Sequence, residues 1–72
     1  MMRELNIALI GCGNWGKNIA RNLHQMGSLA CIYDSNIKLS EKLSYEYSLP
    51  TLELDRIFKN HDINAIVIAS PA

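Results

Sequence analysis

The sequence predicts an α/β protein built on one parallel β-sheet. Short apolar runs alternate along the 72 residues with amphipathic segments of helical period, so the expected element order is β-α-β-α-β-α-β. The last run, residues 65–69, is rich in β-branched residues and lacks polar alternation, which is typical of a parallel strand covered on both faces. Right-handed crossovers between such strands predict a doubly wound sheet of order 3-2-1-4, truncated after strand 4.

A glycine-rich turn separates the first strand from the first helix. Residues 5–10, LNIALI, are mostly apolar and predict a buried strand. A helix is expected from about residue 14 to residue 26, with Gly27 as its C-terminal stop. Its apolar side chains recur at helical spacing and are Trp15, Ile19, Leu23 and Met26. This face is expected to pack on the sheet.

The remaining elements continue the alternation. Residues 29–33 predict a second buried strand, and Asn36 is the expected N-cap of a second helix. The inward positions of that helix are Leu39, Leu43 and Tyr47. A third strand is placed around residues 49–52, where Pro50 indicates an edge position. A short helix over residues 53–59 is expected to bury Leu54, Ile57 and Phe58.

The turn at residues 11–16, GCGNWG, has the pattern G-x-G-x-x-G. A pyrophosphate needs several backbone N–H groups at close range together with the positive end of a helix dipole. Gly11 would permit the tight turn, Gly13 the close approach of the anion, and Gly16 the close packing of helix on strand. Because a strand precedes the turn and a helix follows it, the pattern predicts a Rossmann-like dinucleotide-binding fold.

Asp34 follows the second strand, at the position where an acid accepts hydrogen bonds from the adenosine ribose hydroxyls. A carboxylate there would repel a 2′-phosphate. Sites for NADP usually place an arginine nearby, whereas Ser35 and Asn36 follow here, so NAD is favoured over NADP. The alternative interpretation is that Asp34 only starts the turn into the second helix.

Composition and charge exclude several classes of protein. The net charge is zero and the basic residues are scattered, so no nucleic-acid partner is expected. The first apolar run is too short for a membrane span or a signal sequence, so neither a membrane partner nor secretion is expected and the protein should be cytoplasmic. The two cysteines, Cys12 and Cys31, lack metal-binding spacing and are expected to be reduced, buried fillers.

Two other nucleotide-binding classes share the glycines. A P-loop needs Ser or Thr after its lysine, but Asn18 follows Lys17. An S-adenosylmethionine-dependent methyltransferase usually has an acid just before the glycines, where this chain has Leu9 and Ile10. For Trp15, packing within the protein is favoured over stacking near the cofactor, because it lies on the apolar face of the first helix.

The segments IALIGCGNWGKNIARNL and LPTLELDRIFKNHDINAIVIASPA, together with Asp34, resemble the N-terminal part of the Gfo/Idh/MocA oxidoreductases. The resemblance implies hydride transfer between a nicotinamide cofactor and an alcohol of a sugar or sugar derivative. Matched by position, the pyrophosphate turn would comprise Gly11, Gly13, Asn14, Trp15 and Gly16, and Asp34 would be the ribose acid. Ser70 and Pro71 would match a Thr-Pro pair beside the cofactor.

The catalytic motifs of that family are missing from the chain. The resemblance implies a catalytic lysine in a Glu-Lys-Pro motif and a histidine from a second domain, and neither occurs in residues 1–72. We therefore expect the N-terminal part of a dinucleotide-binding domain, without catalytic residues and inactive alone. Its last strand should form an exposed apolar edge, which favours a homo-oligomer. The alternative is a non-catalytic nucleotide-binding or interaction module.

Overall fold

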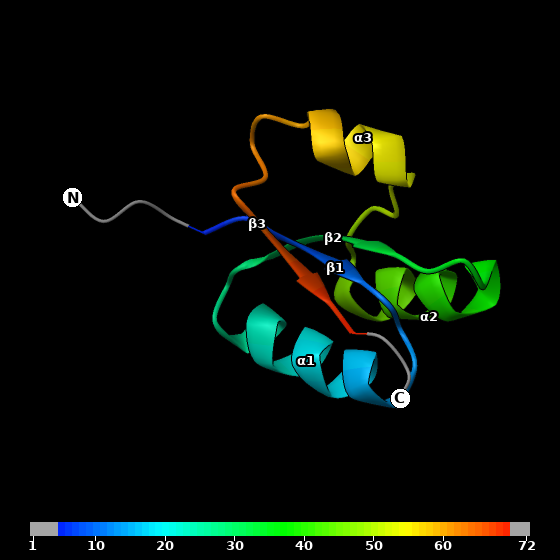
Figure 1. Ribbon diagram of the computed structural model, residues 1–72. Helices are drawn as coiled ribbons and strands as arrows, with labels where there is room; N and C mark the ends of the chain where they lie inside the picture. Colours follow the sequence, from blue (N-terminus) through cyan, green and yellow to red (C-terminus); the bar gives the residue numbers. More distant parts are fainter. Residues whose placement is uncertain (1–4, 70–72) are drawn as a thin grey trace.

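A computed structural model describes residues 5–69 and shows a β-sheet with helices on both faces (Figure 1). The elements in chain order are β1 (Ile7–Ile10), α1 (Asn14–Gln25), β2 (Leu29–Tyr33), α2 (Ile37–Tyr47), α3 (Leu54–Lys59) and β3 (Ala65–Ile68). The helices α1 and α2 lie on one face of the sheet, and α3 lies on the other. Ser70 and Pro71, expected beside the cofactor, fall outside the described residues.

The sheet is parallel and has the strand order β2-β1-β3. The central strand β1 ends at Ile10, which pairs with Tyr33 on one side and with Ile68 on the other. The three strands therefore end at the same edge of the sheet, as in other parallel α/β folds. A core cluster that includes Leu9, Ile32 and Leu43 fills the space between the sheet and the helices α1 and α2.

The predicted third strand at residues 49–52 does not form, so the four-stranded order 3-2-1-4 is wrong. This segment makes one isolated parallel bridge, between Thr51 and Ile32. The Ile32 N–H donates to the Pro50 carbonyl, and the Leu52 N–H donates to the Ile32 carbonyl, both at 3.1 Å. Pro50 has no N–H to extend the ladder, and α3 begins at Leu54. The segment lies beside β2, where the strand was expected, but is too short to become one.

Helix α1 begins as predicted, but a different face contacts the sheet. Gly16 and Ala20 are its buried residues, whereas Ile19 and Leu23 are half-buried. Trp15 and Met26 are each 66% exposed, so the expectation that they are buried is wrong. The small side chains at positions 16 and 20 let the helix backbone approach the sheet closely. Trp15 is the neighbour of Gly16 and lies about 100° around the helix axis from it, so its side chain points away from the sheet.

Helices α2 and α3 follow the predicted patterns more closely. The Asn36 side chain caps α2 by accepting the Lys38 N–H at 3.1 Å, as a residue at this position usually does. Leu43 is buried, and Leu39 and Tyr47 pack at the margin of the same cluster. In α3, Ile57 is buried and Leu54 is half-buried, but Phe58 is 65% exposed. Phe58 follows Ile57 directly and lies about 100° around the helix axis from it, so it points away from the sheet.

Strand β3 is covered on one face only, which contradicts the expectation of cover on both. Val67 packs against the cluster under α1 and α2. Ile66 and Ile68 pair with Ala8 and Ile10 and therefore share the α3 face of the sheet, yet Ile68 is 69% exposed. Helix α3 places Ile57 over Ala8 and Cys31 instead. Within residues 5–69, β3 is an edge strand with an open apolar face, and self-association through it stays a prediction.

Candidate functional site

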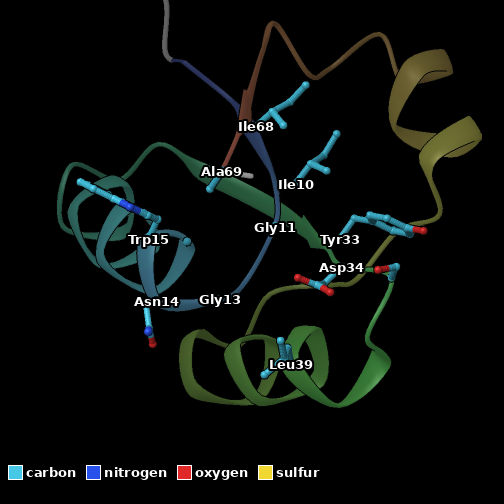
Figure 2. A pocket seen from close by; sticks show the side chains of 12 residues that line it. Ile10, Gly11, Gly13, Asn14, Trp15, Tyr33, Asp34, Leu39, Ile68 and Ala69 are labelled. Carbon is cyan, nitrogen blue, oxygen red and sulfur yellow. The ribbon is translucent and has the colours of Figure 1, made fainter. Parts of the chain in front are cut away.

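A pocket of about 630 Å³ opens at the edge where the parallel strands end (Figure 2). Its volume falls within the range of small-molecule sites, about 300–1,000 Å³. The pocket lies at the end of the central strand, where ligands bind in open α/β sheets. The residues that line it are Ile10, Gly11, Gly13, Asn14, Trp15, Gly16, Tyr33, Asp34, Ser35, Leu39, Ile68 and Ala69.

Gly11 makes the turn that leaves β1. Its φ is +108°, and a Cβ there would lie 2.2 Å from the carbonyl oxygen of Ala69. The turn is anchored on both sides, because the Gly11 N–H donates to the Tyr33 carbonyl and the Ala69 N–H donates to the Ile10 carbonyl, each at 2.8 Å. Glycine is therefore required at this position by backbone conformation and by packing.

Gly16 lets helix α1 pack against this turn. A Cβ at Gly16 would lie 2.0 Å from the carbonyl oxygen of Gly11, far inside any van der Waals contact. The first turn of α1 is thus in direct contact with the backbone that leaves β1. As a result, the first residues of α1 are held where they line the pocket.

Gly13 differs from the other two glycines because the fold does not require it. Its φ of −74° and ψ of −158° suit any residue, and a Cβ there would have no neighbour within 4 Å. The missing side chain leaves open space at the start of α1, where no side chain caps the helix. Backbone N–H groups and the positive end of the helix dipole face this space. The position is therefore suited to an anion that approaches the backbone.

Asp34 connects the β2–α2 loop to the glycine turn. One carboxylate oxygen, Oδ2, accepts the Cys12 N–H, and the other, Oδ1, accepts the Asn36 N–H, each at 2.7 Å. Asp34 therefore does start the turn into α2, and it also reaches the glycine turn. Figure 2 shows the carboxyl group pointing towards the turn near Gly13. Since each oxygen has further lone pairs, the half-buried carboxylate can still accept ligand hydroxyl groups.

Trp15 borders the pocket instead of packing into the protein. It lies at the start of α1 with a side chain that is 66% exposed, which overturns the preference for packing. In Figure 2 its indole points away from Asp34. Asn14, the first residue of α1, is also exposed and lines the pocket.

Sequence reasoning missed the apolar walls of the pocket. These are Ile10 and Ile68 at the ends of β1 and β3, Ala69 just after β3, and Leu39 from the first turn of α2. They appear in the sequence only as core residues of their own elements. Their common signal is position, because residues at the carboxyl ends of neighbouring parallel strands meet at one edge.

The two cysteines lie in separate cores. Cys12 packs in the cluster beneath α1 and α2, and Cys31 packs in the cluster beneath α3. Both are free and buried, as expected. Burial and the neighbouring Asp34 carboxylate raise the pKa of the Cys12 thiol to about 11, and burial raises that of Cys31. The Cys12 thiol donates to the Tyr33 carbonyl at 3.6 Å.

Both thiols should resist alkylation in the folded protein. The thiolate is the reactive form, and the raised pKa of Cys12 leaves about 100-fold less of it at pH 8 than in an ordinary thiol. Iodoacetamide labelling followed by mass spectrometry should show slow modification in buffer and rapid modification in urea. Rapid labelling of the folded chain at pH 8 would contradict the expected resistance to alkylation.

The pKa of Cys12 also predicts how stability depends on pH. Because the Cys12 pKa in the folded chain exceeds the value of the unfolded chain, the stability that the buried thiol contributes is fully present below pH 9 and is lost as pH rises towards about 11.

Neither a metal site nor a membrane span is found within residues 5–69. No group of three or more His, Cys, Asp or Glu side chains in this range could hold a metal ion. No helix in the same range has the length and apolar character to cross a membrane.

Comparisons with known proteins match the sequence to a family model and the structure to a solved fold. The family model described as "Oxidoreductase family, NAD-binding Rossmann fold" (GFO_IDH_MocA) matches residues 5–72. No curated protein sequence shows a significant match. A crystal structure of a Desulfitobacterium hafniense DCB-2 protein, named provisionally as an NADPH-dependent oxidoreductase, is similar with a TM-score of 0.86 and 20% identity. The similarity covers 99% of this chain but 21% of that protein; at this identity it shows the shared fold.

Proposed function

The chain belongs to the Gfo/Idh/MocA oxidoreductase family with an NAD-binding Rossmann fold, and from this premise we propose that its pocket holds NAD as part of a dehydrogenase. Family membership decides against the P-loop and methyltransferase alternatives. It also accounts for the parallel sheet and for a glycine turn at the end of its central strand. The cofactor class is a nicotinamide dinucleotide, which when bound accepts or donates a hydride at its nicotinamide ring.

The open space at Gly13 is the observation that carries this proposal. Gly11 and Gly16 are explained by contacts within the fold, whereas a Cβ at Gly13 would meet nothing within 4 Å. A diphosphate placed there would accept hydrogen bonds from the first N–H groups of α1. Asp34, held next to the same turn by the Cys12 N–H, would accept the hydroxyl groups of the adjoining ribose.

Asp34 further supports NAD over NADP. Both of its oxygens already accept backbone N–H groups, so rotating the carboxylate away to admit a 2′-phosphate would break two charge-assisted hydrogen bonds. Ser35 and Asn36 follow it, and neither supplies the positive charge that a 2′-phosphate needs. The name of the D. hafniense protein mentions NADPH, but the residue at the end of the second strand, rather than the overall fold, sets this choice.

A nucleotide titration of the wild type and of Asp34→Ser tests the proposal. Calorimetry should show that the wild type binds NADH more tightly than NADPH. In Asp34→Ser, NADH affinity should fall by about 10- to 100-fold, because charge-assisted hydrogen bonds to ribose are lost. The preference over NADPH should largely disappear with it.

A matched control is Asp55→Ser, which removes an exposed carboxylate on α3 that does not line the pocket. It should bind NADH like the wild type. Tighter binding of NADPH than of NADH by the wild type would overturn the choice of cofactor. Failure of the wild type to bind either nucleotide would overturn the proposed function itself.

The substrate that we propose is an alcohol of a sugar or sugar derivative. Support comes from the turn GCGNWG and from the run that ends in ASPA. Both resemble the corresponding segments of oxidoreductases that act on such compounds. The described lining of the pocket has two ionisable side chains, Tyr33 and Asp34, and Asp34 is held by two backbone N–H groups. We therefore propose that residues 5–69 bind the cofactor and that the groups moving the substrate proton belong to another part of the enzyme.

A further inference from the structure

Trp15 has more exposed aromatic surface than its place in the fold explains. It is the one tryptophan of the sequence, and its side chain is 66% exposed at the rim of the pocket. Helix α1 meets the sheet through Gly16 and Ala20 instead. Aromatic side chains usually bury a large area in stable contacts. At the rim of a pocket, such a surface is available to a ligand.

Trp15 and Asp34 lie on opposite sides of the glycine turn. Asp34 follows β2, which flanks β1 on one side, whereas Ala69 follows β3 on the other. Figure 2 shows the indole pointing away from Asp34, on the side of the turn where Ala69 lies. The lining of the pocket therefore has an acid, Asp34, on one side of the glycine turn, and Trp15 and Ala69 on the other side.

This arrangement matches the chemistry of a dinucleotide, which has a nucleoside at each end of a pyrophosphate. With one ribose at Asp34 and the pyrophosphate at Gly13, the second nucleoside extends towards the side of Trp15 and Ala69. A planar base there can stack on an indole. We propose that the Trp15 side chain contacts the nicotinamide nucleoside and makes the site prefer a dinucleotide over a mononucleotide. This inference rests on the proposed binding of NAD.

Nucleotide affinities of Trp15→Ala test the inference. Calorimetry should show NADH binding weakened by about tenfold, as expected for the loss of one stacking partner. Binding of AMP, which occupies the Asp34 side alone, should change by less than about twofold. Trp15→Phe should restore most of the NADH affinity because it keeps an aromatic face. Phe58→Ala is the matched control, since Phe58 is equally exposed at 65% but does not line the pocket, and it should leave both affinities unchanged.

Tryptophan fluorescence gives a second readout in the unmodified chain. Acrylamide should quench the exposed indole readily. Saturating NAD⁺ should lower the quenching constant because a stacked base covers one face of the ring, whereas saturating AMP should leave it unchanged. Unchanged NADH affinity in Trp15→Ala, or an equal loss for NADH and AMP, would overturn the inference and leave NAD binding standing. A wild type that binds neither nucleotide would overturn both proposals.

Discussion

Gly13→Asp is expected to abolish NAD binding while making the folded chain more stable. Gly13 is the N-cap of α1, with extended backbone angles and no capping side chain. An aspartate at an N-cap accepts backbone N–H groups of the first turn and interacts favourably with the helix dipole. The free energy of unfolding should therefore rise by a few tenths to about 1 kcal/mol.

The same carboxylate would occupy the place of the diphosphate. It would satisfy the N–H groups that the anion needs and would repel its negative charge. NAD affinity should fall by at least about 100-fold, which corresponds to about 2.7 kcal/mol. Urea unfolding followed by circular dichroism measures stability, and calorimetry measures binding in the same samples.

Gly13→Ala separates the steric effect from the charge. Its Cβ meets no protein atom within 4 Å, so the fold should tolerate it, and NAD affinity should fall by an amount between those of the wild type and Gly13→Asp. Retention of wild-type NAD affinity by Gly13→Asp would show that no anion binds at this turn. A large loss of stability would show instead that the fold itself requires glycine here.

Gly16→Ala is expected to destabilise the whole chain severely. In an exposed helix this substitution would raise stability by about 1 kcal/mol. Here the new Cβ would lie 2.0 Å from the Gly11 carbonyl oxygen, so α1 must move off the turn that holds it. Overpacking a rigid contact typically costs about 1–3 kcal/mol and sometimes more. That is a large part of the stability of a small domain, roughly 4–11 kcal/mol for this length.

Urea denaturation of Gly16→Ala and of a control on the same helix measures this effect. Asn22→Ala changes an exposed position of α1 and should leave stability equal or slightly higher, because alanine is the better helix former. The opposite signs of the two changes distinguish tertiary contact from helix propensity. A Gly16→Ala chain as stable as the wild type would show that α1 does not rest against the glycine turn.

Local chemistry made much of this fold predictable. Asn36 was identified as a cap because its side chain competes for N–H groups only a few residues away. Gly11 and Gly16 were assigned to the tight turn and to close packing, and the clashes that a Cβ would meet at each are consistent with those roles. The assignment of Gly13 and Asp34 to a nucleotide remains a prediction, which the geometry supports and the experiments above test.

The predictions that were wrong all concern contacts between elements. Helical spacing placed Trp15 on the buried face of α1, but the small residues Gly16 and Ala20 set the rotation of that helix on the sheet. The expected alternation of strands and helices placed residues 49–52 in a strand, but a strand needs a ladder of partner hydrogen bonds, and Pro50 cannot donate one.

The sequence by itself determined the alternation of strands and helices and the position of the glycine turn, because each depends on patterns within a few residues. The parallel sheet could be inferred from that alternation through the rules of chain connection. Only the tertiary structure decided which surfaces remain open, namely the space at Gly13, the exposed indole of Trp15 and the uncovered side of Ile68. Exposure depends on what the rest of the chain places against a residue. That is a property of packing in three dimensions, and no local pattern encodes it.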